Sequence, residues 1–385
     1  MARISAALIV RDESAVIADC LHSLIGNVDE IVLVDTGSRD DTMEIARQFP
    51  IQLHHFTWCD DFSAARNFAL ERASGDWILS IDADERFEIP DREAYARLLT
   101  DNGKAAWEVR LHPRTGWTPY ATIRLFRNDP RIRYRGVAHE KIEPSAGAVA
   151  RSDGLEIGMC DLRVVHIATA ADQHAKGPRY LPLLRKQLAR DPDNFYCWWH
   201  LGECLRLSGD AAAASEAWSA GISRLRNIEP EHRKLGDSIL YLSLIELQNE
   251  CGDFSDALFA EAVSVYPNHL TLQWFAARLA VERGDIEVAQ PILEKLMAID
   301  AETFFEPQLA YDKALFRHIP AQALALGHFR DGRFDEASRL YRIAAQTAPD
   351  ANACYLKARL AELRLSARGS APRSADVPTF ASQWQ

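Results

Sequence analysis

The chain has 385 residues and a formal net charge of −11, and 48% of its residues are hydrophobic and 26% charged. This composition is typical of a globular protein, and at roughly 100–200 residues per domain the length indicates two or three domains. The acidic balance argues against a protein that binds a nucleic-acid backbone, because such proteins carry a basic domain or stripe.

The seven cysteines are scattered and none forms a C-x-x-C pair. A disulfide framework or a zinc site is therefore not expected, and a reducing cytoplasm fits best. The apolar run at residues 4–10 is a marginal signal-peptide core, and no stretch approaches the roughly 20 apolar residues of a membrane span. We expect a cytoplasmic protein without a transmembrane segment, with peripheral attachment to a membrane left open.

The first 170 residues alternate short apolar runs with amphipathic stretches. We expect strands over residues 4–10, 30–34, 51–56 and 77–81, and helices over residues 14–25, 41–49 and 62–73. This alternation predicts a parallel sheet covered on both faces. Further strands, without helices between them, are expected over residues 105–112, 121–126 and 132–135, and another strand over residues 162–167. The late change of pattern favours an α/β domain whose second half closes over a ligand.

From about residue 173 onward the pattern is helical, and a glycine followed five residues later by an alanine recurs. The glycines are Gly209, Gly252, Gly284 and Gly332. A helix–turn–helix repeat needs glycine at its tight turn and a small residue where the paired helices approach. The pattern resembles the tetratricopeptide repeat, with insertions near residues 229–234 and 303–319. We expect four repeats, a capping helix over residues 351–365, and a disordered tail rich in Ser, Ala and Pro.

Asp82 and Asp84 lie where the fourth predicted strand ends. That end of a parallel strand faces the crevice in which α/β sheets bind ligands. A turn there lets both carboxylates reach one hard cation, Mg²⁺ or Mn²⁺, which often shares its ligands with substrate phosphates. A solvated turn is the more common fate of such a pair. Asp35, at the end of the second strand, adds a carboxylate that can accept hydrogen bonds from a nucleotide base.

Five motifs in this order resemble the family 2 glycosyltransferases with the GT-A fold. They are VRDE at residues 10–13, VDTGSRDDT at 34–42, ARN at 65–67, GDWIL at 75–79 and DAD at 82–84. The resemblance covers about residues 3–180. It implies a hexosyl- or N-acetylhexosaminyl-transferase that uses a nucleotide-diphosphate sugar, usually a UDP-sugar.

The resemblance also implies residue roles on the donor side. Asp35 would contact the base, and Arg11 and Glu13 would lie beside the same nucleotide. Asp82 would lie near the ribose, and Asp84 would bind the metal and the diphosphate. Arg66 would belong to the nucleotide pocket.

One departure from the family pattern concerns the catalytic base. Many members carry a Glu-Asp pair on a later helix, and no clear pair occurs here. His139-Glu140 instead resembles the His-Glu version of a bacterial branch that also carries tetratricopeptide repeats and includes enzymes that glycosylate peptides. On that resemblance His139 and Glu140 are the catalytic candidates, with Glu140 removing a proton from the acceptor. Orientation of the acceptor or of a loop is the alternative role for Glu140.

Three further residues follow from the resemblance. His166 ends the last predicted strand, where a histidine often completes the metal shell of GT-A enzymes; a packed histidine is the alternative. Lys176 and Arg179 match a Lys–Arg pair that could neutralise the diphosphate, or they lie on a solvated helix face.

Seven arginines at residues 110–135 either line an anionic site or form a solvated sheet face.

We therefore predict an α/β GT-A domain at residues 1–180, an all-α tetratricopeptide-like domain at 181–365 and a tail at 366–385. The predicted function is metal-dependent, inverting transfer of a sugar to a protein, peptide or glycan. The repeats would recruit the acceptor or form a homodimer, and no nucleic-acid partner is expected. An interaction scaffold with an inactive transferase domain and a sugar-nucleotide pyrophosphorylase are the alternatives. Neither a G-x-G-x-x-G nor a P-loop motif is present, which argues against a dinucleotide oxidoreductase and a P-loop NTPase.

Overall fold

The computed structural model describes residues 2–167 and 170–369. The chain divides into two compact units. One holds the chain up to His269 together with the segment Phe305–Tyr311, and the other holds Leu270–Phe304 and the described residues from Asp312 onward. All the candidate site residues lie in the first unit.

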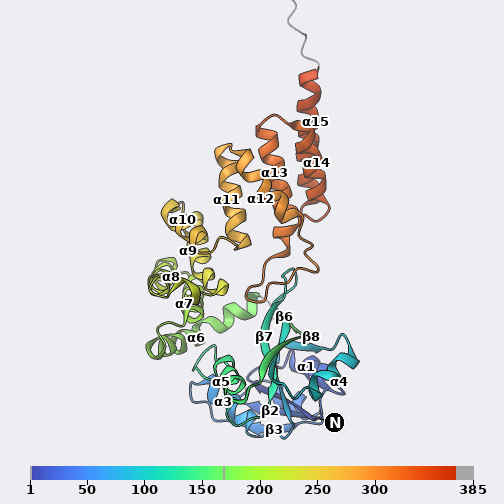
Figure 1. The fold of residues 1–385 in the computed structure, drawn as a ribbon, viewed down its shortest axis with the longest axis vertical. Helices are drawn as coiled ribbons and strands as arrows, with labels where there is room; N and C mark the ends of the chain where they lie inside the picture. Colours follow the sequence, from blue (N-terminus) through green and yellow to red (C-terminus); the bar gives the residue numbers. More distant parts are fainter. Residues whose placement is uncertain (1, 168–169, 370–385) are drawn as a thin grey trace, which may run out of the picture. The chain divides into compact units, whose positions relative to one another are not determined.

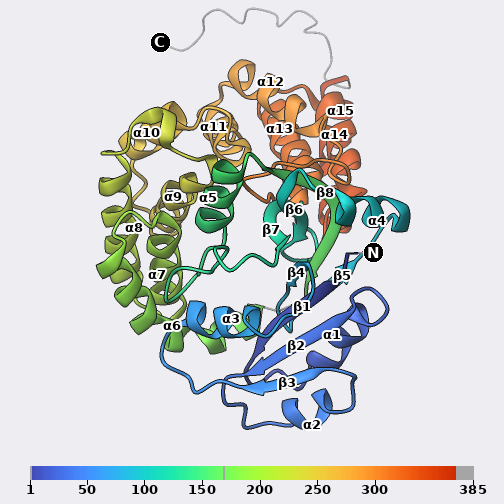
Figure 2. The same ribbon diagram turned by 60° about the horizontal axis from the view of Figure 1, so that its bottom comes forward.

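An eight-stranded sheet, in the order β3-β2-β1-β4-β7-β6-β8-β5, forms the centre of the first unit (Figures 1 and 2). Its strands are β1 (Ile4–Val10), β2 (Glu30–Asp35), β3 (Gln52–His55), β4 (Trp77–Ser80), β5 (Glu85–Glu88), β6 (Lys104–His112), β7 (Tyr120–Arg127) and β8 (Glu156–His166). The first four strands are parallel, whereas β7 runs antiparallel to β4 and β6, and β5 antiparallel to β8. The expected GT-A architecture, a parallel half that continues into a mixed half, is confirmed.

Helices cover both faces of the parallel half. They are α1 (Ile17–Leu24), α2 (Thr42–Ala46), α3 (Phe62–Leu70), α4 (Arg92–Thr100) and α5 (Glu143–Asp153). Neighbouring residues of β1 point to opposite faces, as the two-residue period of a strand requires. Leu8 packs in a cluster with Leu21 of α1, and Ala7 packs in a second cluster with Leu70 of α3.

One sequence prediction in this domain is wrong, and two helices were not predicted. Residues 132–135 form no strand, because the side chain of Asn67 bonds the backbone N–H and C=O of Tyr134 and takes the place of a neighbouring strand. Helix α5 was not expected; it begins with a proline in its first turn and ends at Gly154, whose φ is 68°. Helix α4 was also missed, since Tyr95 is its only buried residue and its apolar spacing is weak.

The rest of the described chain is helical, and the expected tetratricopeptide-like region is confirmed. In the first unit it comprises α6 (Ala170–Arg190), α7 (Phe195–Leu207), α8 (Ala211–Leu225), η1 (Pro230–His232), η2 (Leu235–Ser238), α9 (Ile239–Cys251) and α10 (Asp256–Val265). In the second it comprises α11 (Leu270–Arg283), α12 (Ile286–Met297), η3 (Lys313–Phe316), α13 (His318–Arg330), α14 (Phe334–Ala345) and α15 (Ala351–Gly369).

The repeat glycines lie where the pattern predicts. Gly209, Gly252, Gly284 and Gly332 each follow the first helix of a pair with φ between 73° and 87°. A side chain is strained in this left-handed region, so glycine suits the turn. The alanines five residues later are buried in three pairs, whereas Ala257 is exposed.

The predicted domain limits stay predictions. Helix α6 runs through residue 180, and α15 continues four residues past the expected end at residue 365, to Gly369. The remainder of the predicted tail, residues 370–385, lies outside the described residues. Within the described chain, no helix is both long and apolar enough to cross a membrane.

Candidate active site

A tight turn after β4 carries the two aspartates. The backbone N–H of Glu85 donates to the carbonyl of Asp82 at 3.0 Å, and the N–H of Asp82 donates back to the Glu85 carboxylate at 2.8 Å. The turn therefore closes on itself, and the chain re-enters the sheet as β5. Asp82 and Asp84 consequently contact different partners.

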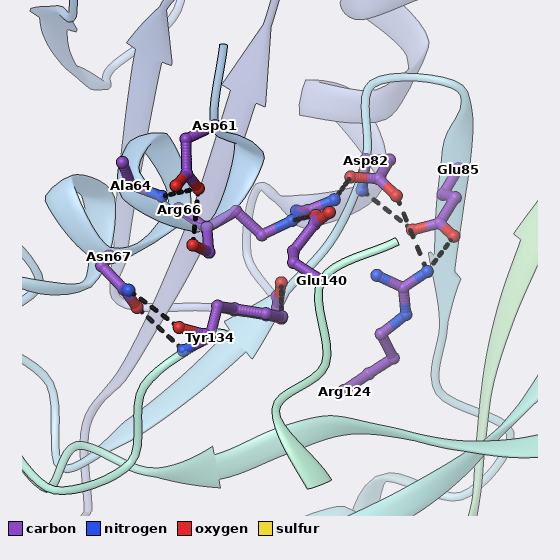
Figure 3. Close-up of polar contacts among 11 residues, drawn as sticks. Asp61, Ala64, Arg66, Asn67, Asp82, Glu85, Arg124, Tyr134 and Glu140 are labelled. Atoms are coloured by element: carbon purple, nitrogen blue, oxygen red, sulfur yellow. Dashed lines mark hydrogen bonds and ion pairs between the residues drawn. The ribbon is translucent and has the colours of Figure 1, made fainter. Parts of the chain in front are cut away.

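Arg66 of α3 joins Asp82 to Glu140 (Figure 3). Its Nη2 lies 2.7 Å from Asp82 Oδ1, and its Nε donates to Glu140 Oε1. Burial disfavours the charged guanidinium, but Asp82 and Glu140 outweigh it and hold the pKa of Arg66 well above its usual value. Burial likewise opposes ionisation of Asp82, yet Arg66 and Arg124 keep its pKa well below the usual range. The three side chains form a pre-assembled ionic bridge.

Arg124 and Glu85 extend this charged cluster; Arg124 is one of the seven arginines singled out in the sequence, whereas sequence reasoning missed Glu85. Arg124 Nη2 lies 2.5 Å from Glu85 Oε1 and 3.7 Å from Asp82 Oδ2. The Glu85 side chain is 3% exposed, and burial raises its pKa to about 7 despite the opposing charge of Arg124. The position of Glu85 directly after the aspartates was the available signal, but acidic residues after a strand are usually solvated.

His166 lies beside Asp84 because β5 and β8 pair antiparallel with Glu85 opposite His166. His166 Nε2 is 3.3 Å from Asp84 Oδ2, and His166 Nδ1 is 3.0 Å from the carbonyl oxygen of Pro113. A carbonyl only accepts, so Nδ1 carries the proton of that hydrogen bond and Nε2 is directed at Asp84. Burial lowers the pKa of His166, and its contact with Asp84 outweighs burial and raises it.

The carboxylate of Asp84 and the imidazole of His166 lie side by side, and both groups are suitable ligands for a divalent cation. No group of three or more His, Cys, Asp or Glu side chains within residues 2–167 and 170–369 is arranged to hold a metal. Asp84 and His166 therefore fit a cation that takes its other ligands from water and a diphosphate, not one enclosed by protein.

The predicted nucleotide-binding residues come from two interlocked loops. The backbone N–H groups of Asp12 and Glu13 donate to Ser38 and Thr42, and the N–H of Arg39 donates to Asp12. These bonds fix the loops after β1 and β2 against each other. Arg11 and Glu13 thus lie on the loop that is bonded to the turn after Asp35.

Asp35 itself is 5% exposed and bonded by its own turn. It accepts from the backbone N–H of Ser38 at 2.9 Å and of Gly37 at 3.1 Å, and His55 Nδ1 lies 3.3 Å away. Burial raises the pKa of Asp35, but hydrogen bonds from Ser38 and Gly37 outweigh it and lower the pKa. The carboxylate is therefore ionised and fixed in orientation.

Helices of the repeat region hold the loop that carries Glu140. Val137 N–H donates to the Gln187 side chain of α6 at 2.8 Å, and Phe62 N–H donates to the Val137 carbonyl at 3.1 Å. Gly136 and His139 have φ values of 112° and 49°, so the loop doubles back sharply before Glu140. Because Gln187 is 6% exposed, this polar contact is shielded from water.

His139 packs in a cluster of neutral rings. Its imidazole stacks on His200 of α7 with ring centres 3.8 Å apart, and it meets Tyr196 edge-on at 5.2 Å and Tyr180 at 6.2 Å. Burial lowers the pKa of His139 to about 4 and that of His200 well below its usual value. Both imidazoles are neutral at physiological pH, unlike the ionised groups around Asp82.

The remaining candidates from the sequence are Lys176, Arg179 and the arginines at residues 110–135. Lys176 and Arg179 lie where side chains are outside the described residues. The arginines at residues 110–135 do not form one site. Arg124 enters the charged cluster, whereas Arg131 pairs with Asp129 and Asp153, and Arg110 pairs with Asp161.

Known proteins resemble this chain over its N-terminal domain and part of its helical region. Residues 5–153 match the model of Glycosyl transferase family 2. A TPR repeat-containing protein of Synechococcus elongatus is 35% identical over 265 residues, which span 67% of this chain and 64% of that protein. The SPbeta prophage-derived glycosyltransferase SunS of Bacillus subtilis is 24% identical over 287 residues, 72% of this chain and 66% of SunS. The match thus spans slightly less than two thirds of each relative.

Among solved structures, the mannosyltransferase PcManGT of Pyrobaculum calidifontis in complex with GDP-Man and Mn²⁺ aligns with 70% of this chain and 87% of its own. It is 16% identical, with a TM-score of 0.38. The family match and the motif residues gathered at one end of the sheet lead to one conclusion. Residues 5–153 of this chain form a domain of the Glycosyl transferase family 2 type.

Proposed function

We propose that this protein is a cation-dependent, inverting glycosyltransferase that moves a sugar from a nucleotide-diphosphate sugar, a UDP-sugar, to an acceptor. One observation carries the proposal: Arg66 contacts Asp82 and Glu140 at once. Asp82 belongs to the motif that resembles the donor site, and Glu140 is the candidate base. A single buried guanidinium thus fixes the distance between the donor side and the acceptor side before either substrate binds.

The donor side is assigned from the two interlocked loops and the turn after β4. Asp35 would accept hydrogen bonds from the base, with Arg11 and Glu13 beside it, and Asp82 would lie at the ribose. Asp84 and His166 would hold Mg²⁺ or Mn²⁺. Such a cation neutralises charge that develops on a departing diphosphate. Lys176 and Arg179 would add positive charge at the same diphosphate.

Glu140 would act as the base. It accepts the proton of the acceptor nucleophile as that atom bonds to the anomeric carbon, and the bond from this carbon to the diphosphate breaks on the opposite face. The electron pair of the broken bond leaves with the nucleotide. Glu140 has one oxygen held by Arg66, and the carboxylate is thereby oriented for this transfer. His139 would serve by holding the loop through its ring contacts.

The ring cluster beside Glu140 favours an uncharged acceptor group on a protein, a peptide or a glycan. Burial keeps His139 and His200 uncharged at neutral pH and raises the pKa of Tyr196, whose residue is nevertheless 43% exposed. Neutral rings can stack on the apolar face of a sugar or of a side chain. Residues 1–180 would perform the chemistry and residues 181–365 would recruit the acceptor. The exposed leucines of α15, such as Leu356 at 71%, would suit a homodimer.

An inactive scaffold is a poorer explanation of the charged cluster. The side chains of Arg66, Arg124 and Glu85 are largely removed from water. Burying such ions costs several kcal/mol each, and their mutual attraction offsets this cost only when the geometry is good. Apolar replacements are often neutral or stabilising at such positions. A chain that used only its repeats would have no need of these charges.

Release of nucleoside diphosphate from a panel of sugar nucleotides, with Mn²⁺ or Mg²⁺, tests the proposal. Asp84→Ala should abolish the cation dependence together with most activity. Glu140→Gln should lower kcat while sparing donor binding by calorimetry. Glu71→Gln, an exposed change at the end of α3, is the matched control and should behave as wild type. If no nucleotide binds with either cation, the scaffold is favoured; full activity of Asp84→Ala would remove the metal assignment.

A further inference from the structure

The long connection between α12 and α13 contains a segment that belongs to the other compact unit. Phe305–Tyr311, which we call the strap, groups with the transferase domain, although the chain on both sides of it groups with α11–α15. Residues 298–312, between α12 and η3, form no helix or named strand, and stretches of this length without regular structure are uncommon in compact domains and often have a function. The contacts of the strap indicate which one.

The strap is bonded to the hairpin of β6 and β7. Thr118, in the loop between these strands, forms two hydrogen bonds with Tyr311. Its backbone N–H donates to the Tyr311 carbonyl at 2.8 Å, and its Oγ1 accepts from the Tyr311 N–H at 2.8 Å. Ala121 N–H donates to the Pro307 carbonyl at 2.9 Å, and the Arg110 guanidinium lies 4.8 Å from the Phe305 ring centre.

The strap is also anchored to the repeat side of the first unit. The side-chain oxygen of Gln308 accepts from Leu235 N–H at 2.9 Å, and the ring of Tyr311 meets that of His269 at 5.5 Å. Thr118, Tyr311 and His269 are at most 2% exposed. The hydrogen bonds between Thr118 and Tyr311 are therefore made away from water, where losing a partner is costly.

The loop that the strap fixes begins with the residue that orients His166. Pro113 opens the loop and accepts the Nδ1–H of His166, and Thr118 lies near its other end. Between them the loop is closed by a bond from Trp117 N–H to the Arg114 carbonyl at 3.2 Å and by the Arg114 guanidinium 3.9 Å from the Trp117 ring centre. A short, closed loop transmits a shift at Thr118 to Pro113.

We propose that the strap is a positioning element for the cation site: Tyr311, through Thr118 and the Pro113 carbonyl, keeps His166 Nε2 directed at Asp84. This inference rests on the proposed function, because it gives the Asp84–His166 pair a cation to bind. Partners that bond the far nitrogen of a metal-binding histidine fix its tautomer and ring orientation, and losing them weakens metal binding about 10–100-fold. Thr118 and Tyr311 contact neither the cation nor the sugar, so they act only through His166.

Thr118→Val tests the proposal, because valine keeps the shape of threonine and removes only the acceptor of the Tyr311 N–H. The readout is Mn²⁺ binding by electron paramagnetic resonance, without sugar nucleotide. We expect Mn²⁺ affinity to fall about tenfold. A milder variant, Phe305→Leu, removes the contact with Arg110 and should give a smaller loss in the same direction. Glu156→Gln, at the opposite end of β8 from His166, is the control and should bind Mn²⁺ as wild type does.

The same variants in a His166→Ala background separate positioning from general damage. If the strap acts through His166, Thr118→Val should cause no further loss of Mn²⁺ affinity there. Wild-type affinity in Thr118→Val, or an equal loss with and without His166, would overturn the strap proposal alone. Wild-type protein that binds no Mn²⁺ would overturn the metal assignment of the proposed function and the strap proposal with it.

Discussion

The two sides of Glu140 are held by different physical means. On one side, Arg66, Asp82, Arg124 and Glu85 form a buried network of ion pairs. On the other, burial keeps His139 and His200 uncharged, and their rings pack face to face. On the proposed function, the charged side would face the diphosphate and the cation, and the neutral side would face the acceptor that gives its proton to Glu140.

The charged cluster and the neutral ring cluster should respond differently to substitution and to pH. A network of buried charges depends on every member, since removing one leaves its partner without compensation. A packed neutral cluster tolerates substitution by rings of similar size but is sensitive to protonation. Changes to the charged side should therefore have large effects, greatest above about pH 7 where Glu85 is ionised, and changes to the neutral side smaller effects that appear only on acidification.

The largest effect is expected from Arg66→Met. This change leaves the carboxylates of Asp82 and Glu140 without the cation that they share. We therefore expect kcat to fall about 10²–10³-fold and the free energy of unfolding to fall by about 3–5 kcal/mol. Arg66→Lys keeps the charge but loses the two-armed contact and should recover stability more than kcat. Steady-state kinetics and urea unfolding measure both quantities. A kcat within twofold of wild type would show that the bridge has no part in the reaction.

Arg124→Met should be the next most damaging change, because it leaves Glu85 buried without its cation. We expect a loss of about 3–5 kcal/mol in the free energy of unfolding. Arg124→Met combined with Glu85→Gln removes the charge pair as a whole, and a glutamine oxygen can still accept the Asp82 N–H. The double variant should regain at least half of the loss in urea unfolding. Additive losses would instead mean that the two side chains act independently.

These two predictions concern contacts that no local sequence pattern encodes. The turn with Asp82 and Asp84 was predictable, because a strand ends there. Arg66 and Glu140, however, are 74 residues apart, and their contact depends on how Asn67 bonds the backbone of Tyr134 and leads the chain past α3. The expected strand at residues 132–135 would have directed Glu140 elsewhere.

The same limit applies to the cation site and the strap. His166 was proposed from its place at the end of a strand, but its approach to Asp84 needs β5, whose sequence Glu-Arg-Phe-Glu has no apolar run to predict it. The insertion at residues 303–319 was found from the spacing of the repeat glycines, which are fixed by local backbone conformation. The contact of this insertion with the loop between β6 and β7 could not be predicted, since Tyr311 and Thr118 are 193 residues apart in the sequence.

On the neutral side, stability should depend on pH through the stacked histidines. The pKa of His139 is about 4 in the folded protein and 6.5 when unperturbed, so the unfolded chain takes up the proton first as the pH falls. The contribution of His139 to the free energy of unfolding should be constant above pH 6.5 and decrease between pH 6.5 and 4, by on the order of 2 kcal/mol because its ring is half-buried. Glu85, whose pKa is raised to about 7, contributes with the opposite sign in both proteins, so the comparison between them isolates the stacked rings. His200→Phe keeps a stacked ring, removes the second titrating group and should reduce this slope. Urea unfolding at pH 7.5 and pH 5 tests it, and equal slopes in both proteins would contradict the pKa assignment of His200.

The smallest effect is expected from Gln187→Leu, which removes the side chain that α6 places under the Glu140 loop. Val137 N–H then loses its acceptor in a buried position, at a cost of about 1–3 kcal/mol in the free energy of unfolding. The loop of residues 136–140 carries Glu140 but none of the residues proposed to bind the sugar nucleotide. We therefore expect kcat to fall while the nucleotide affinity measured by calorimetry is unchanged. Gln187→Glu keeps an acceptor oxygen and should retain more of kcat than leucine does. A nucleotide affinity that falls in step with kcat would mean that α6 supports the whole transferase domain and not only the loop of Glu140. The charged cluster and the neutral ring cluster would then not act independently.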